Sequence, residues 1–327
     1  MKITVRWGSV SRLCACLVFV GLFLPTPAQA ASPVIYVDKN NSSCANSGTG
    51  VGTQTKPYCS INSAAQVATA GQTVQVAAGT YTETVTPKNS GASGSPIVYQ
   101  SAPGALVTID GSANGFKIDT RSYISVIGFT VTNMSSNGIS VKNSNHITVS
   151  NNHVSLSGQP VSGSVQAGIL IRATNDSLVS GNTSDHNTDG GIYLNTGSTR
   201  NLIKGNILFS NARQYTRAAP GIDVRSPGNT IVGNISHDNE DSGIQLYNGA
   251  NDSIVYDNLT YNNGDHGIDC LNSTGAVIVG NSVYRSTTAG INLEGASGTS
   301  ASTGGTVENN ISVDNGLTNT SGTHGNI

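Results

Sequence analysis

The stretch Gly243-Ile244-Gln245-Leu246, followed one repeat later by Gly267-Ile268-Asp269-Cys270, decides the fold. The same four-residue step, a glycine and then apolar residues at the next and third positions, occurs eight times. It begins at residues 115, 138, 168, 191, 221, 243, 267 and 290. A second step ends in asparagine, at Asn152, Asn182, Asn206, Asn234, Asn258, Asn281 and Asn310, and a third short strand-like run follows each asparagine. The alternation of apolar and polar residues within these steps is typical of β-strands.

Successive glycines stand 22 to 30 residues apart, which is room for three short strands and their turns. One such coil cannot bury its own inner face, but a stack of coils can. We therefore predict an all-β fold, a right-handed parallel β-helix with three strands per coil and about eight coils over residues 111–327. The asparagines are assigned to structure, because asparagine tolerates left-handed turns and stacked amides bond from coil to coil.

Two of the intervals are 30 residues long and carry additional loops, 157–166 and 211–220. Loops on a rigid scaffold are frequent binding sites. The repeat does not visibly stop before residue 327, so we expect self-association or a continuation of the chain. The alternative is that residues 317–325 fold back as a minimal cap.

Residues 1–30 have the features of a signal peptide: Lys2, Arg6 and Arg12, a short apolar run, and the cleavage site Ala28-Gln29-Ala30. This predicts a secreted protein, extracellular or periplasmic, and no later segment is apolar enough for a membrane span. In an oxidising compartment Cys44 and Cys59 are expected to form a disulfide. The charge balance, 16 basic against 18 acidic residues without a basic run, argues against nucleic acid as a partner but permits an acidic polysaccharide.

Residues 31–110 do not show the sequence pattern of the repeats and are predicted to form an N-terminal cap with the first coils. A strand is expected over 35–38 and a short helix over 60–70, ending at Gly71. Such a segment can cover the open end of a solenoid and protect its strand edges.

Several cap motifs resemble the entry segment of secreted β-helix proteins similar to the family 9 pectate lyases. They are Tyr36-Val37-Asp38, Lys56-Pro57-Tyr58-Cys59-Ser60-Ile61, Ala70-Gly71-Gln72-Thr73-Val74-Gln75-Val76, Ala78-Gly79-Thr80-Tyr81 and Ser95-Pro96-Ile97. The resemblance covers the cap well and the coils generically. It implies the β-helix fold and points to polysaccharide lyase activity, although the same entry segment also precedes other functions.

Outward positions two and four residues after each repeat glycine carry polar and aromatic side chains suited to a sugar-binding groove. The candidate substrate-binding residues are Arg172, Tyr193, Asn195, Asp223, Gln245, Tyr247 and Glu294. The alternative is an ordinary solvated strand face.

The same face contains a candidate metal site, whose first two residues stand one coil apart. Asp241 and Asp265 both stand two residues before a repeat glycine, so their carboxylates should stack and repel unless a proton or a cation lies between them. With Asp269 they offer oxygen ligands for Ca²⁺. Family 9 lyases have an Asp-Asp-Gly-x-Asp run here, and His266 replaces its second Asp, which removes one ligand. The alternative is that these aspartates only cap turns.

Lyase chemistry also needs a base to remove the C5 proton of a uronate. The resemblance implies a lysine beyond the calcium coil, but no lysine follows Lys204. The candidate catalytic residues are therefore Arg225, His266 and Arg285.

We expect a secreted, carbohydrate-active β-helix protein, a calcium-dependent lyase that cleaves a uronate-containing polysaccharide by β-elimination. The alternative is a non-catalytic polysaccharide-binding or cell-surface protein. The Asp-Pro-His run of alginate C5-epimerases and the paired-Asp and Gly-His-Gly steps of polygalacturonases are absent from the sequence.

Overall fold

A computed structural model describes residues 33–158, 166–213, 218–295 and 301–317. The predicted signal peptide, most of the 157–166 loop and most of the 317–325 segment lie outside these residues. Residues 32–327 form one compact unit. Within the described residues, no helix is long and apolar enough to cross a membrane.

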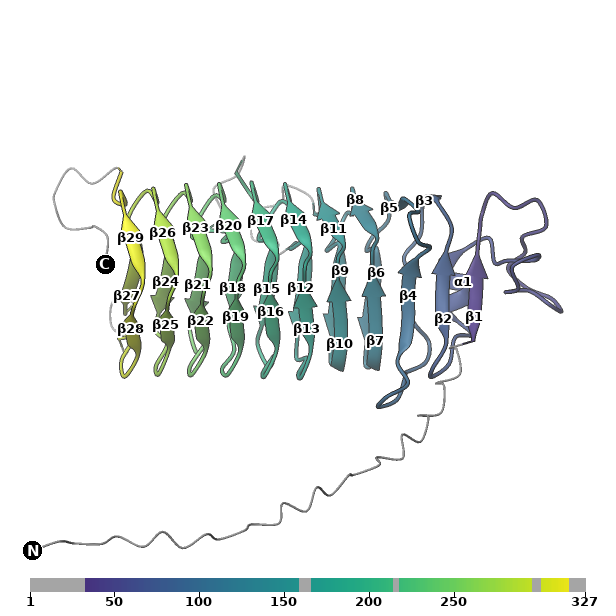
Figure 1. Ribbon diagram of the computed structural model, residues 1–327, viewed down its shortest axis with the longest axis horizontal. Helices are drawn as coiled ribbons and strands as arrows, with labels where there is room; N and C mark the ends of the chain where they lie inside the picture. The colour runs from purple at the N-terminus through teal and green to yellow at the C-terminus, as the bar shows by residue number, and fades with distance from the viewer. Residues whose placement is uncertain (1–32, 159–165, 214–217, 296–300, 318–327) are drawn as a thin grey trace, which may run out of the picture. The chain divides into compact units, whose positions relative to one another are not determined.

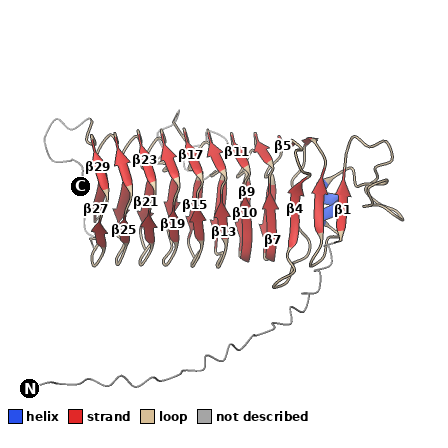
Figure 2. Cartoon of the chain, viewed as in Figure 1, coloured by secondary structure: helices blue, strands red, loops and turns tan. Residues whose placement is uncertain are grey.

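The unit is a parallel β-solenoid of three sheets, and from β6 onward each complete coil contributes one strand to each sheet (Figures 1 and 2). Sheet A has eleven strands: β1 (Val34–Val37), β2 (Thr73–Val76), β4 (Ile97–Ser101), β7 (Ser122–Ile127), β10 (Asn145–Ser150), β13 (Leu178–Ser180), β16 (Leu202–Lys204), β19 (Thr230–Val232), β22 (Ile254–Tyr256), β25 (Val277–Val279) and β28 (Thr306–Glu308).

Sheet B has ten strands: β3 (Gly79–Tyr81), β5 (Val107–Asp110), β8 (Thr130–Thr132), β11 (His153–Ser155), β14 (Thr183–Asp185), β17 (Ile207–Phe209), β20 (Ile235–His237), β23 (Leu259–Tyr261), β26 (Ser282–Tyr284) and β29 (Ile311–Val313). Sheet C has eight: β6 (Phe116–Asp119), β9 (Ile139–Lys142), β12 (Ile169–Arg172), β15 (Ile192–Asn195), β18 (Ile222–Val224), β21 (Ile244–Tyr247), β24 (Ile268–Leu271) and β27 (Ile291–Glu294). The eight repeats recognised in the sequence are the strands of sheet C, which confirms the predicted fold.

Columns of identical or similar residues fill the interior. Ile192, Ile222 and Ile244 are partners in register on successive strands of sheet C, and all are fully buried. Branched side chains suit this arrangement because they pack well on a pleated surface. Cys270, the register partner of Leu246, also points inward and is buried with a free thiol.

The predicted asparagine ladder lies inside the corner between sheets A and B. Each side-chain amide donates to the Oδ1 atom of the next asparagine at 2.9 to 3.0 Å. The left-handed backbone is, however, one residue earlier than expected: Asn151, Gly181 and Asp257, rather than the ladder residues that follow them, have positive φ angles. The ladder side chain can therefore turn inward and satisfy buried backbone groups.

The cap contains one helix, α1 (Ile61–Ala65), which is shorter than the predicted 60–70. Glu83 fixes its start, accepting hydrogen bonds from the Ser60 hydroxyl and the Ile61 backbone at 2.7 and 2.8 Å. The helix stops early because the Ala65 carbonyl accepts the Lys88 N–H instead of continuing a helical hydrogen-bond pattern.

The predicted disulfide between Cys44 and Cys59 is present in the cap. Strand β2 of this region pairs with β4, and β4 pairs directly with β7 of the repeats in sheet A. At the other end, Ile311 of β29 is 63% exposed. The expectation of self-association or continuation stays a prediction.

Candidate functional site

The outer face of sheet C carries two rows of side chains, which differ in exposure. The outer row stands two residues after each repeat glycine and consists of Lys117, Ser140, Leu170, Tyr193, Asp223, Gln245, Asp269 and Asn292. The rim row stands four residues after the glycine and includes Arg172, Asn195, Arg225, Tyr247 and Glu294. Tyr193, Asp223, Gln245 and Asp269 are only 0 to 8% exposed, so these predicted groove residues do not form an open solvated face. The rim row is the part that solvent reaches.

Arg225 is the most completely held side chain of the rim row. Its Nε donates to Asp223 Oδ2 at 2.7 Å. Its guanidinium carbon lies 5.6 Å from the centre of the Tyr193 ring on the preceding coil and 4.7 Å from that of Tyr247 on the following coil. Cation–π contacts of this kind favour a fixed guanidinium plane. Its two terminal nitrogens have no partner among the described residues, and a third of the side chain is exposed.

Asp223 anchors Arg225 from a fully buried place. Burial raises the pKa of Asp223 to about 6, and the charge of Arg225 opposes the shift. Its second oxygen, Oδ1, has no hydrogen-bond partner among the described residues. Below it, Tyr193 is oriented by a 3.0 Å hydrogen bond from its hydroxyl to Asp189 Oδ1. Burial raises the pKa of the Tyr193 phenol well above its usual value. Tyr193 therefore serves as a neutral ring and donor.

Asp241 and Asp265 do stack in neighbouring coils, as predicted, and the Asp265 backbone N–H donates to the Asp241 carbonyl at 3.4 Å. Burial raises the pKa of Asp241 to about 7, and the Asp265 carboxylate adds to the shift. His266 Nδ1 lies 3.1 Å from Asp265 Oδ2, although the two atoms are not aligned as a hydrogen bond. Burial alone would raise the pKa of Asp265, but contacts with His266 and Thr288 lower it. Burial and the Asp265 charge therefore favour the protonated form of Asp241, while Asp265 stays ionised.

Asp269 has a different set of partners. Its Oδ2 accepts a hydrogen bond from the Gln245 amide at 3.0 Å and its Oδ1 accepts one from the Asn292 amide at 2.9 Å. Burial raises the pKa of Asp269, and these amides oppose the shift. Both carboxylate oxygens are thus engaged along the outer row.

The donor set as arranged does not fit a three-carboxylate calcium site. No group of three His, Cys, Asp or Glu side chains in the described ranges is gathered closely enough to hold an ion. Both oxygens of Asp269 accept hydrogen bonds from amides, and the raised pKa of Asp241 favours its protonated form, which relieves the repulsion from Asp265. The calcium site stays a prediction, and no chemical step is derived through it.

The remaining candidates lie apart from this cluster. Arg285 is exposed just after β26, at the sheet B corner, with a left-handed φ of 57°. Arg172 and Glu294 are exposed at the rim, and Asn195 is half-buried. The structure therefore brings Arg225 together with Tyr193, Asp223 and Tyr247. It places His266 beside Asp265, which stacks on Asp241.

Two residues outside the predicted set contribute to these clusters. Asp189 orients Tyr193, and Asn292 binds Asp269. Both occupy repeat positions that the sequence already marks: Asp189 stands two residues before Gly191, as Asp241 does before Gly243, and Asn292 is a member of the outer row. The sequence repeat gives the positions of Asp189 and Asn292, but it does not give their hydrogen-bond partners.

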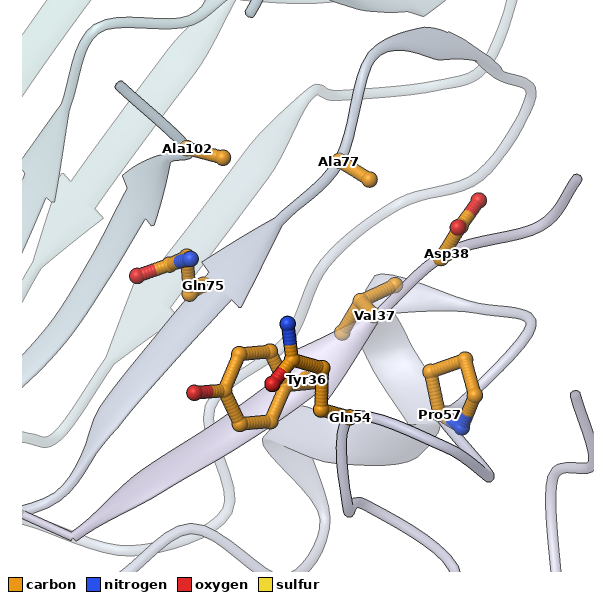
Figure 3. Close-up of a pocket in the computed structure, with 8 residues that line it drawn as sticks. All are labelled: Tyr36, Val37, Asp38, Gln54, Pro57, Gln75, Ala77 and Ala102. Atoms are coloured by element: carbon orange, nitrogen blue, oxygen red, sulfur yellow. The ribbon is translucent and has the colours of Figure 1, made fainter. Parts of the chain in front are cut away.

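The cap contains a pocket of about 180 Å³ (Figure 3). Tyr36 and Asp38 from the β1 segment, Gln54 from the following loop and Gln75 from β2 contribute to its lining. Asp38 is its only ionisable carboxylate, and it accepts the Asn40 N–H at 3.0 Å within a turn. This pocket has no chemistry comparable to sheet C.

Two family models match the chain. The model described as Pel9A-like, right handed beta helix region, matches residues 35–152. The model described as right handed beta helix region matches residues 106–219 and 208–327, about two thirds of the sequence. The first match covers the cap, where the sequence motifs indicate the same relationship.

Individual relatives are more distant. The uncharacterized protein YwoF of Bacillus subtilis (strain 168) is 30% identical over 142 residues, which is 38% of this chain and 29% of that protein, so the match spans less than a third of the relative's length. An alginate lyase from Paenibacillus sp. str. FPU-7 superposes with a TM-score of 0.61 at 16% identity, covering 78% of this chain and 95% of the other. Pectate lyase Pel9A superposes with a TM-score of 0.53 at 16% identity, covering 86% and 80%. At such identities these two structures establish the fold alone.

Proposed function

The chain belongs to the right-handed β-helix family, and on that premise we propose that it acts on a uronate-containing polysaccharide. The fold is that of the alginate lyase and of pectate lyase Pel9A, whose names identify acidic polysaccharides as their substrates. The observation that carries the proposal is the Arg225 site. A guanidinium held by Asp223 and by two tyrosine rings presents its terminal N–H groups to solvent, and this is the geometry that a carboxylate prefers.

Arg225 acts as an anchor in this proposal. Its plane and its Nε are fixed before the substrate arrives, so little conformational freedom is lost when a carboxylate binds. Asp223 keeps the guanidinium from turning inward, and Tyr247, half-exposed on the next coil, provides an apolar surface beside it for a sugar ring.

The proposed reaction is β-elimination at the Asp241–Asp265–His266 group, one to two coils further along the helix. His266, beside the Asp265 carboxylate, accepts the C5 proton of a uronate. The C4–O bond breaks as the C4–C5 double bond forms, and the departing oxygen takes a proton from Asp241. The pKa of Asp241, about 7, suits a group that must donate and regain a proton near neutrality. Arg285, a third candidate base, has no support because it is at another corner.

We further propose that the protein is exported, as its N-terminal sequence predicts. The disulfide between Cys44 and Cys59 supports this, because such bonds persist mainly outside reducing compartments.

A second candidate function is non-catalytic binding of the same polymer. It is favoured by the burial of His266 and Asp241, each 7% exposed, which restricts access to the proton-transfer group. In that case Arg225 would bind uronates and no bond would break.

A lyase assay separates the two candidates. The purified protein is incubated with polygalacturonate, with alginate and with a neutral glucan, and the ultraviolet absorbance of unsaturated uronates is followed. The lyase proposal expects an increase with one acidic polymer, and its loss in Asp265→Asn and Arg225→Ala. Binding without absorbance would establish the second candidate. Failure to bind either acidic polymer would refute both.

A further inference from the structure

A pair of basic residues lies on the rim row, in the coils that precede Arg225. Lys142 ends β9 and Arg172 ends β12, and the two are direct partners in the register of sheet C. Like charges directly opposite each other on adjacent strands are destabilising. Neither side chain makes an ion pair or a hydrogen bond within the described residues, and Arg172 is exposed.

Two arginines of the solenoid, Arg200 and Arg225, are each paired with an aspartate, whereas Arg121 and Arg213 donate to backbone carbonyls. Arg200 forms a two-pronged pair with Asp176 at 2.7 and 2.8 Å on the adjacent coil. Arg225 has Asp223. For Lys142 the nearest acid in register is Asp119 on the preceding coil, whereas Arg172 faces Asn195 on the following coil. The Lys142–Arg172 pair is thus a local excess of positive charge on a chain whose formal net charge is −2.

The two side chains line a shallow pocket of about 460 Å³, together with Asn143, Ala173, Thr196 and Gly197. Two of the lining residues, Ala173 and Gly197, have the smallest side chains. Gly197 has a φ of 82°, and a Cβ atom built there would lie 3.3 Å from the Ala173 Cα. Gly197 thus packs closely against Ala173, and neither residue has a long side chain that could cover the two charges.

The pocket is aligned with the Arg225 site. Arg172, Asn195 and Arg225 occupy the same rim position in successive coils, and the Arg225 N–H donates to the Leu194 carbonyl at 2.8 Å in continuation of that register. Two strand spacings, about 10 Å, therefore separate Arg172 from Arg225 along the solenoid.

We propose that Lys142 and Arg172 form a second anion subsite, which binds another carboxylate of the same acidic polysaccharide chain. The polymer then follows the rim of sheet C, with one carboxylate at this pocket and a later one at Arg225. The inference rests on the proposed function for the identity of the anion. The charge, the pocket and the alignment are independent of the proton-transfer group.

The test is the dependence of affinity on chain length. Calorimetry at low salt compares uronate oligomers from two to eight sugars on the wild type, on Lys142→Ala/Arg172→Ala, and on Lys204→Ala. Lys204 is an exposed lysine at the end of β16, on another sheet, so its variant removes a charge without touching the rim.

We expect the double variant to bind the longest oligomers about tenfold more weakly while dimers, which reach only one site, are unaffected. Lys204→Ala should match the wild type. Oligomer binding with the same length dependence in the double variant would overturn the subsite and leave the proposed function standing. An equal loss in Lys204→Ala would also overturn it, because any positive charge would then suffice. If the wild type binds no uronate oligomer at all, both proposals fail.

Discussion

The asparagine ladder and the outer row of sheet C share the same coil-to-coil spacing, yet one is uniform and the other is not. In the ladder, every described member bonds to its neighbour in the same way. In the outer row the residue type changes at each coil, from Tyr193 to Asp223 to Gln245, and each makes different contacts. A contact that is the same in every coil indicates a requirement of the fold. Residue types that differ from coil to coil on the same scaffold indicate a requirement of a ligand.

The largest effect is expected in the ladder. Asn206→Ala removes hydrogen bonds to Asn182, Asn234 and the Val179 carbonyl, and it leaves buried polar groups without partners. We expect a loss of about 4 kcal/mol in the free energy of unfolding. Denaturant melts would measure it. A loss below 1 kcal/mol, on the order of a surface substitution, would mean that the ladder is dispensable.

A smaller effect on stability, but a large one on binding, is expected at Arg225. Arg225→Ala leaves the buried Asp223 carboxylate without its cation, and we expect a loss of about 3 kcal/mol at pH 8. Adding Asp223→Asn should restore most of the stability but none of the affinity for uronate oligomers. Recovery of both by the double variant would show that Arg225 serves only to neutralise Asp223.

The raised pKa of Asp241 predicts that the stability of the fold depends on pH. The pKa of Asp241 is raised from an ordinary 3.8 to about 7, so between these values the folded chain holds a proton that the unfolded chain has lost. Stability should therefore fall as pH rises through this window, by on the order of a few kcal/mol. The lowered pKa of Asp265 has the opposite effect, but only below the ordinary value of 3.8, outside this window.

Asp241→Asn should flatten that decline. Melting temperatures at pH 5, 6, 7 and 8 would measure the slope, and Asp257→Asn, at an exposed carboxylate just after β22, is the control. Identical slopes in Asp241→Asn and the wild type would show that Asp241 is ionised throughout.

The smallest effect is expected from calcium. Because the described carboxylates are not gathered around one point, millimolar Ca²⁺ should shift the melting temperature by less than about 1 °C. The calcium site predicted from the sequence requires the opposite: a clear rise in the melting temperature that Asp265→Ala abolishes. Differential scanning calorimetry with calcium and with chelator decides between them.

Much of the scaffold was readable from the sequence because it repeats. The glycine steps marked the strands of sheet C, and the asparagines marked one corner. A second ladder, Asn187, Asn211, Asn239 and Asn263, was missed although each member stands five residues after a member of the first.

The candidate site could be predicted from the sequence repeat only in part. Periodicity gives the direction in which Asp223 or Asp269 points, but burial depends on neighbouring coils. Whether Asp269 is free to join Asp241 and Asp265 around an ion depends on the orientations of Gln245 and Asn292, and no spacing encodes these. The length of α1 was missed for the same reason, since its end is set by Lys88, a residue distant in sequence.

The rigid stacking of sheet C makes its rim a lattice. Cationic groups there are spaced by whole multiples of one strand separation, about 4.8 Å, and no side-chain motion changes the period of the backbone. A polymer can engage two such groups only if its own charge period is commensurate with that lattice. Selection among acidic polysaccharides would then be decided by the pitch of the chain, and two polymers built from the same charged group could be told apart by their repeat lengths alone.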